Sequence, residues 1–241
     1  MAKAPQKPEE IFSEFTNDYQ EIYGTDLLSI VLYGSGARGD YIPGRSDLNF
    51  LIVLTEEGIK GLHKAFKVVA TWHRRRVATP LFMTQEYIAT SLDTFPLEFL
   101  NIKRDYHVVW GKNPLGKLRI RKRPLRLQLE REIKGKLLQL REAYLSSEGR
   151  GRELVAVASQ SFTAFLSIFQ GILYLREKET PHQRGAIIKA IAAETGLATE
   201  PFGRLLVLKE GKTRLSVKKM KGLMESYIEE IRRLAFWVDE M

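Results

Sequence analysis

The sequence predicts an α+β protein, with a small mixed-sheet domain at residues 1–117 followed by an all-α helical bundle at residues 118–241. In the first part, short β-branched apolar runs bounded by Gly- and Pro-containing turns alternate with helical patterns. In the second part, apolar residues recur at helical spacing with few breaks. The length of 241 residues is sufficient for two modest domains.

The distribution of charge supports the same division. Residues 1–117 contain 14 basic and 14 acidic side chains, so the net charge of +9 lies entirely in the C-terminal part. The densest basic stretch is Lys112–Arg126, which holds seven basic side chains and no acidic one. This stretch could bind the phosphates of a nucleic acid or of a nucleotide, or it could be a solvated connector; nucleic acid is not the favoured partner.

The first domain is expected to begin with an amphipathic helix whose apolar residues form one stripe. Its expected elements, in chain order, are a helix at 8–23, strands at 30–33 and 50–54, a helix at 58–74, a strand at 77–83, a short helix at 84–91 and a strand at 107–110. In the helix at 58–74, we expect Leu62, Phe66 and Val69 to face the core. The three arginines at 74–76 suit the negative end of the helix dipole, with phosphate binding as the alternative.

The second domain is expected to be a bundle of about five helices, at 126–146, 153–176, 182–195, 199–208 and 216–241. Residues 154–175 carry no charge and are numerous enough to span a membrane. Their Ser, Thr and Gln residues, and the lack of a second such segment, favour a central buried helix with Phe162, Phe165 and Phe169 on one side. We therefore expect no membrane partner.

The candidate site lies in the segment 28–54, where two apolar strands are joined by a glycine-rich turn. Gly34-Ser35-Gly36 follows the first strand directly, so its backbone N–H groups could face a polyphosphate. Asp47 and Asn49 stand two residues apart at the start of the second strand, so their side chains are expected on one face. A phosphate-binding turn facing two oxygen ligands is what Mg²⁺-dependent nucleotidyl transfer requires.

This pattern resembles the signature of the polymerase-β-like nucleotidyltransferases, including small bacterial antibiotic nucleotidyltransferases. The resemblance is specific over residues 28–54 and looser up to about residue 111. It implies Mg²⁺ as the cofactor and a nucleoside triphosphate as the ligand. It also implies roles for six residues: Gly34, Ser35, Arg38 and Ser46 in nucleotide binding, and Asp47 and Asn49 in catalysis and metal ligation.

The chain departs from the family pattern at the metal ligands. The family has acids at both positions of the second motif, whereas this chain has Asn49, whose amide oxygen can ligate but brings no negative charge. The third acid of the family usually lies on a later strand, and the candidate strand at 76–83 contains none. Glu98 is the nearest acid in apolar sequence, and it could be the missing ligand or simply an exposed residue beside a turn. The metal site is therefore predicted to be degenerate.

Residues 34–39 also match the G-x-G-x-x-G pattern of dinucleotide sites. In that fold the glycines open a long helix that leads to a parallel strand. Here Pro43-Gly44 interrupts the chain shortly after Gly39, and no room remains for a crossover helix. The spacing therefore favours a hairpin-like return and disfavours NAD. The four histidines are scattered and there is no cysteine, so a zinc site is not expected.

The sequence thus predicts a nucleotidyltransferase-superfamily protein that binds a nucleoside triphosphate in a cleft between its domains, with transfer weak or absent. The alternative is an active Mg²⁺-dependent enzyme that moves a nucleoside monophosphate to a hydroxyl of a small molecule or protein. The acceptor or protein partner and the base stay open. The absence of cysteine and of an apolar leader in MAKAPQKPEE leads us to expect a cytoplasmic location.

Overall fold

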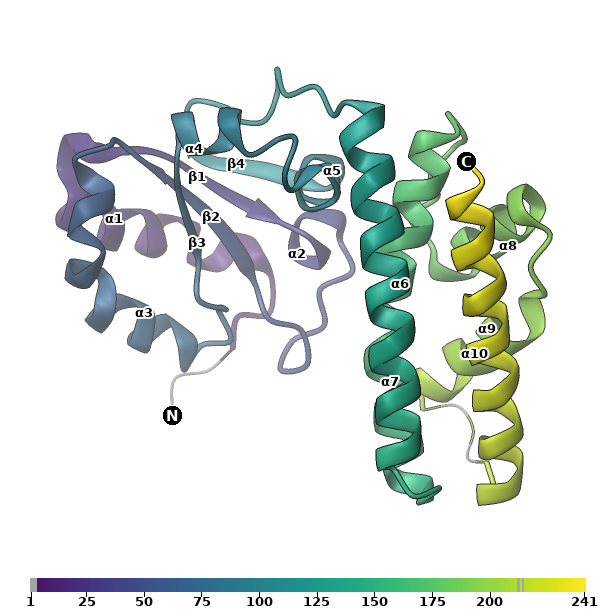
Figure 1. Cartoon of the computed structure of the whole chain (residues 1–241). Helices are drawn as coiled ribbons and strands as arrows, with labels where there is room; N and C mark the ends of the chain where they lie inside the picture. The colour runs from purple at the N-terminus through teal and green to yellow at the C-terminus, as the bar shows by residue number, and fades with distance from the viewer. Residues whose placement is uncertain (1–3, 212, 214) are drawn as a thin grey trace. The chain divides into compact units, whose positions relative to one another are not determined.

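The computed structural model describes residues 4–211, 213 and 215–241. The chain divides into two compact units, Met1–Ile120 and Arg121–Met241. The first unit contains the strands and the second contains only helices among its described elements (Figure 1). This mixed sheet followed by an all-helical region confirms the predicted fold class.

A four-stranded sheet with the order β3-β2-β1-β4 forms the centre of the first unit. Its strands are β1 (Leu27–Tyr33), β2 (Asn49–Leu54), β3 (Leu81–Thr84) and β4 (Tyr106–Gly111). β1 pairs antiparallel with β2 and β4, and β2 pairs parallel with β3. A parallel pair needs a crossover connection, which is supplied by the helices between β2 and β3.

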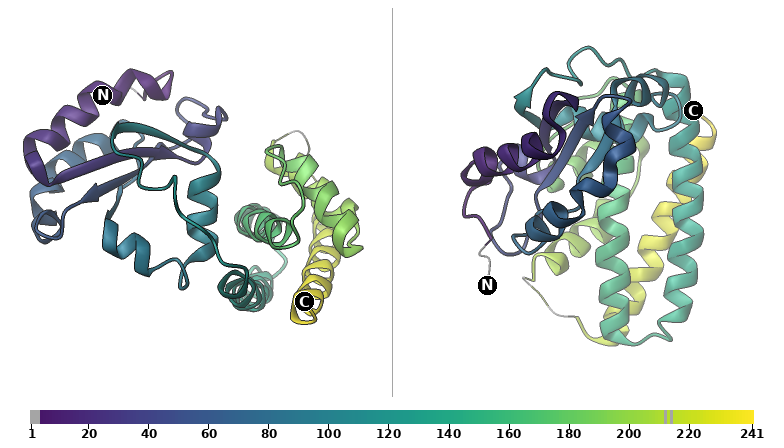
Figure 2. Two further views of the ribbon diagram at one scale, coloured as in Figure 1. Left: turned by 90° about the horizontal axis from the view of Figure 1, so that it is seen from above. Right: turned by 90° about the vertical axis from the view of Figure 1, so that its left-hand side faces the viewer.

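Helices cover both faces of this sheet. On one face, η1 (Pro8–Ile11), α1 (Phe12–Tyr23) and α3 (Phe66–His73) contribute side chains to one apolar cluster. At its centre Phe15 stacks on Phe50 at 4.1 Å and meets Trp72 edge-on at 5.1 Å. The other face is covered by α4 (Gln85–Thr90) and α5 (Pro96–Arg104), and Figure 2 shows α5 across the sheet from α1. Because both faces are covered, every residue of β2 after Asn49 is buried.

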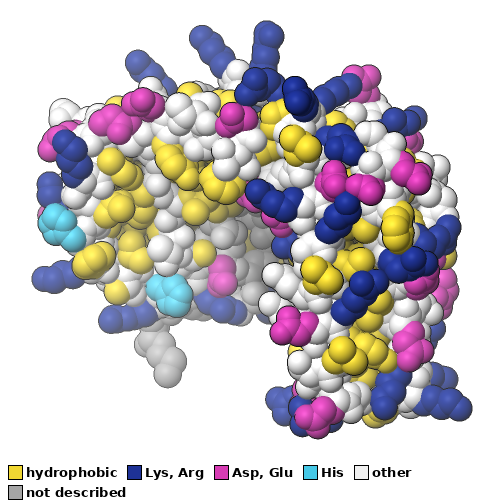
Figure 3. Space-filling model, viewed as in Figure 1, with side chains coloured by type: hydrophobic (Ala, Val, Ile, Leu, Met, Phe, Trp, Pro, Cys, Tyr) yellow, Lys and Arg dark blue, Asp and Glu magenta, His cyan; other side chains and the backbone are white. Residues whose placement is uncertain are grey.

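The expected inward face of the helix at 58–74 is wrong for Leu62 and Phe66, whereas Val69 is partly buried and packs against the core as expected. The segment begins as a 3₁₀ helix, η3 (Gly58–Ala65), and Gly61 has non-helical backbone angles. This break changes the register of the helical pattern, so Ala65 and Trp72 are buried while Leu62 is exposed and Phe66 is 72% exposed. An open groove of about 760 Å³ is lined by Leu62, Ala65, Phe66, Val69 and Phe82. Figure 3 shows hydrophobic side chains gathered on this unit's surface.

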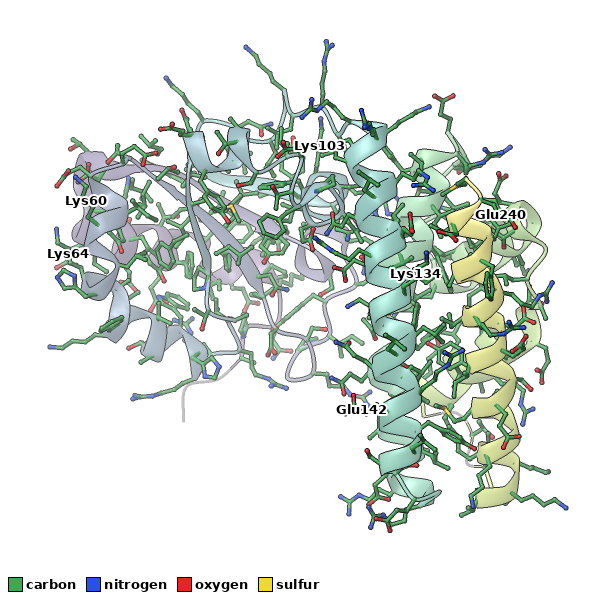
Figure 4. The ribbon with its side chains drawn as sticks, viewed as in Figure 1. Lys60, Lys64, Lys103, Lys134, Glu142 and Glu240 are labelled. Carbon is green, nitrogen blue, oxygen red and sulfur yellow. The ribbon has the colours of Figure 1, made fainter. Side chains whose placement is uncertain are left out.

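The second unit is a bundle, and its described residues form five helices close to those expected from the sequence. They are α6 (Lys122–Ser146), α7 (Gly151–Leu175), α8 (Arg184–Thr195), α9 (Thr199–Lys209) and α10 (Val217–Asp239). Lys134 of α6 donates to Asp239 of α10 at 2.7 Å, joining the two helices at the surface (Figure 4). An ion pair of this exposed kind adds little stability, so packing must hold the bundle together.

That packing is centred on α7, which contacts the four other helices of the bundle. Phe165 and Phe169 of α7 meet Tyr227 and Phe202 edge-on at 6.0 and 5.3 Å. Such edge-to-face pairs add to the stabilisation from area burial. By length and composition α7 is the helix in the described part of the chain that could cross a membrane, and half of its most apolar window is buried within the bundle.

Candidate nucleotide-binding site

The glycine-rich segment forms a tight turn and a single helical turn. Gly34 follows β1 with φ +74°, α2 (Ser35–Arg38) begins next, and Gly39 ends it with φ +88°. These positive φ values favour glycine. Gly36 is favoured for a different reason, because a Cβ there would lie 2.9 Å from Leu48 Cδ2 and the buried Leu48 side chain would have to shift. The glycines therefore allow the backbone of α2 to lie against the strands. The antiparallel pairing of β1 with β2 confirms the hairpin-like return and excludes a dinucleotide-binding βαβ unit.

The backbone amides of this turn are not equivalent. The Gly34 N–H donates to the Asp105 carbonyl at 3.0 Å, so it is engaged within the protein. Ser35 and Gly36 occupy the first turn of α2, where the amides of a helix have no intrahelical acceptor. A phosphate at this turn would therefore meet the Ser35 and Gly36 amides and the Ser35 hydroxyl, and Gly34 would serve as the bend that presents them.

Asn49 lies beside this turn, and Asp47 is two residues before it, so the two are not both on the strand. Asn49 is the first residue of β2 and pairs with Tyr33, while Asp47 precedes the strand. A Cβ built on Gly34 would lie 3.8 Å from Asn49 Nδ2, so the carboxamide of Asn49 is next to the turn. The side chain of Asp47 is 52% exposed. The structure thus brings Asn49 of the second motif to the turn of the first.

A third side chain, which the sequence pattern did not assign to the site, joins them. Arg76 Nη1 lies 3.4 Å from Asp47 Oδ1, and Arg76 Nη2 donates to the Gly44 carbonyl at 2.5 Å. The backbone brings Arg76 here because the chain after α3 pairs with Leu48: the Leu48 N–H donates to the Arg76 carbonyl at 2.8 Å. No local sequence signal identifies this contact, because it depends on an isolated parallel bridge between Leu48 and Val77.

The charges of Arg76 and Asp47 both act on the hydroxyl of Tyr41. Burial raises the pKa of its hydroxyl, the charge of Arg76 lowers that pKa and the charge of Asp47 raises it. The hydroxyl itself donates to the Pro5 carbonyl at 3.0 Å. Asp47 and Arg76 therefore act electrostatically on one small region at the start of β2.

Arg38 and Ser46, both predicted to bind nucleotide, have internal partners. Arg38 Nη1 lies 3.3 Å from Asp105 Oδ2, and Arg38 Nε lies 2.7 Å from Asp40 Oδ2. Asp105 is nearly buried and is also held by Arg104 at 2.9 Å. The Ser46 hydroxyl accepts from the Ile42 N–H at 3.1 Å and closes the loop before Asp47. Both side chains therefore position the segments that carry the site.

The side chains around Asp47 do not fit a resident Mg²⁺ ion. Magnesium in proteins is bound mainly through carboxylates and substrate phosphates. Here one carboxylate is paired with a guanidinium and its neighbour Asn49 is uncharged. Glu98 lies in the first turn of α5 and is exposed. Within the described ranges, no group of three or more His, Cys, Asp or Glu residues could hold a metal ion.

This architecture, a mixed sheet with a turn after β1 and an antiparallel β2, followed by a helical second unit, is also found among solved structures. The chain is similar to spectinomycin adenyltransferase AAD(9) from Enterococcus faecialis, whose crystal structure was solved with ATP and spectinomycin. The match has a TM-score of 0.52 and 12% identity, and covers 91% of this chain and 99% of that chain. No protein-family model matches the sequence, and no curated protein matches it. The resemblance inferred from residues 28–54 is confirmed for the fold.

Proposed function

We propose that this protein binds a nucleoside triphosphate at the Gly34–Ser35–Gly36 turn and transfers nucleotides weakly or not at all. The observation that carries the proposal is the position of Asn49 beside Gly34, with Asp47 two residues before it. The spacing of a nucleotidyltransferase motif in the sequence also supports the proposal, and at one of the motif's acidic positions this chain has the amide Asn49.

The phosphates are proposed to bind at the start of α2. The Ser35 and Gly36 amides and the Ser35 hydroxyl are suitable donors for an anion, and the N-terminal end of a helical turn favours negative charge. Arg38 contributes by holding α2 in place through its pair with Asp105. ATP is the first ligand to test, because the structurally similar AAD(9) was solved with ATP.

Weak or absent transfer is proposed because the site lacks charge that the reaction needs. Phosphoryl transfer is catalysed mainly by positioning and by electrostatic stabilisation of the transferring group. This chain offers one carboxylate at the motif, and Arg76 compensates its charge. The predicted cofactor, Mg²⁺, would reach such a site only as the counter-ion of the nucleotide's phosphates, since the protein supplies an incomplete set of ligands.

The alternative is an active enzyme, and it is favoured by the extent of the structural match, which includes the helical unit. In that reaction an acceptor hydroxyl oxygen would bond to the α-phosphorus of the triphosphate. The bond to the bridging oxygen would break, pyrophosphate would leave, and the hydroxyl proton would pass to solvent. The acceptor would be a small molecule or a protein.

Calorimetric titration of the full chain with ATP, GTP, CTP and UTP, in EDTA and in excess Mg²⁺, tests the proposal. We expect heat of binding for at least one triphosphate and a weaker affinity for Ser35→Ala, because a phosphate loses one hydroxyl donor. Ser226→Ala is the matched control, since its hydroxyl bonds to the Gly222 carbonyl within α10. Absence of heat with all four triphosphates under both conditions would contradict the proposal.

A further inference from the structure

Arg76 is held at the motif by contacts on both sides of its guanidinium. One side approaches Asp47 and the other donates to the Gly44 carbonyl. The backbone at Arg76 has φ +65°, a left-handed conformation that non-glycine residues rarely adopt. Its carbonyl accepts from the Leu48 N–H, and this bond fixes the conformation. The pairing of Leu48 with the chain after α3 therefore positions Arg76 close to Asp47, the residue that precedes Leu48.

The guanidinium also stays accessible, with 44% of the side chain exposed. A guanidinium has five N–H donors in a planar fork that matches phosphate oxygens. The contacts with Asp47 and Gly44 leave donors that can bind a further ligand. By contrast, Arg38 is 20% exposed and already holds two carboxylates, so it has less capacity for a phosphate.

We propose that Arg76 takes the place of the divalent cation at this site: it neutralises Asp47 and binds the phosphates of the nucleotide, so that triphosphate binding does not need Mg²⁺. The inference rests on the proposed nucleotide binding. It explains why a chain with one motif carboxylate places an arginine against it. The cation is part of the protein, and its position is fixed by the pairing of Leu48 with Val77.

The test compares ATP affinity in EDTA and in excess Mg²⁺ for the wild-type chain, by isothermal titration calorimetry. We expect the two affinities to differ by no more than a few-fold. If Asp47 instead releases Arg76 and binds Mg²⁺ together with the nucleotide, affinity will be much weaker in EDTA, and the inference is overturned while the proposed function stands. If ATP gives no heat, the same comparison is made with the triphosphate that binds, and if none of the four binds under either condition, both are overturned. This comparison does not depend on the folding of any variant.

Variants at residue 76 identify the group responsible. Arg76→Gln should weaken ATP binding in EDTA by about tenfold or more, because a charge-assisted contact to phosphate is lost. Added Mg²⁺ should recover part of that loss, since Asp47 is then free to ligate. Arg76→Lys keeps the charge without the fork and should lose less. Arg74→Gln is the matched control, because Arg74 is exposed, is the C-terminal cap of α3 two residues before Arg76, and loses the same positive charge. Equal affinities for Arg76→Gln and Arg74→Gln, with both variants folded by circular dichroism, would overturn the inference.

Discussion

Two arginine–aspartate pairs in the first unit have the same chemistry in different surroundings. The Arg38–Asp105 pair joins α2 to the chain before β4, and its side chains are 20% and 5% exposed. The Arg76–Asp47 pair lies at the start of β2, and both its side chains are about half exposed. A buried charge without its partner costs several kcal/mol, whereas an exposed pair contributes about 0–1 kcal/mol. The first pair is therefore part of the structure, and the second is free to exchange partners with a ligand.

The largest effect on the free energy of unfolding is expected when the same comparison is made with two phenylalanines, one buried and one exposed. Phe15 is fully buried between Phe50 and Trp72, whereas Phe66 is mostly exposed. We expect Phe15→Ala to lower the free energy of unfolding by about 3–5 kcal/mol because it leaves a cavity, and Phe66→Ser to change it by less than about 0.5 kcal/mol. Urea titration followed by tryptophan fluorescence measures both, since Trp72 and Trp110 lie in this unit. A large loss for Phe66→Ser would mean that its side chain is covered.

The two aspartates give the direct test. Asp105→Ala should lower the free energy of unfolding of the first unit by about 3 kcal/mol, because Arg38 and Arg104 keep their charges in a nearly buried position. Asp47→Ala should change it by less than about 1 kcal/mol. The same urea titration compares them. Similar losses for the two variants would remove the distinction between a structural pair and a ligand-binding pair.

The role of Arg38 can be tested in the same way. The sequence assigned this residue to nucleotide binding, whereas the structure gives it two internal partners. We expect Arg38→Gln to cost about 2 kcal/mol of stability, as loss of a charge-assisted hydrogen bond does. If Arg38 acts by positioning α2, Asp105→Asn should weaken ATP binding as well. If Arg38 binds phosphate directly, Asp105→Asn should free it and strengthen ATP binding. Calorimetry with folded variants distinguishes these outcomes.

Asn49→Asp restores the negative charge that the family motif has at this position. Among these variants it should change the free energy of unfolding least, and it should change the affinity for ATP. Asn49→Asp places a second carboxylate beside Gly34, so ATP should bind about tenfold more weakly in EDTA through repulsion of its phosphates. Excess Mg²⁺ should reverse this loss. Titration of ATP with and without Mg²⁺ gives the result, and an affinity unchanged in EDTA would place the residue 49 side chain away from the phosphates.

Turnover of the same variant separates a nucleotide-binding protein from an active enzyme. Pyrophosphate release by the wild type should be undetectable with candidate acceptors, because removing one electrostatic stabiliser typically costs about a hundredfold or more in rate. Asn49→Asp alone should not restore full turnover unless Glu98 or another acid completes the site. Brisk turnover by the wild type, little changed in Asn49→Asp, would favour the active enzyme instead.

Much of the fold was predictable because its signals are local. Helical periodicity predicted the five helices formed by the described residues of the second unit, to within a few residues at most of their ends. The close spacing of Gly39, Pro43-Gly44 and the second apolar run predicted an antiparallel return after β1. Glycine conformation and strand alternation act over a few residues, so the sequence alone contains this information. It also predicted that the Gly34–Ser35 turn and the Asp47–Asn49 motif form one site, and the pairing of Tyr33 with Asn49 places Asn49 next to that turn.

Only the tertiary structure decided which groups surround that motif. The break at Gly61 turned Phe66 outward, and pairing between distant segments brought Asp105 to Gly34 and Arg76 to Asp47. A helix terminus was the favoured explanation for the three arginines at 74–76, with phosphate binding as the alternative, and the sequence could not show which of the three lies beside Asp47. A single parallel bridge, Leu48 with Val77, determined its position. Contacts of this kind depend on how strands meet in space, and periodicity along the chain cannot specify them.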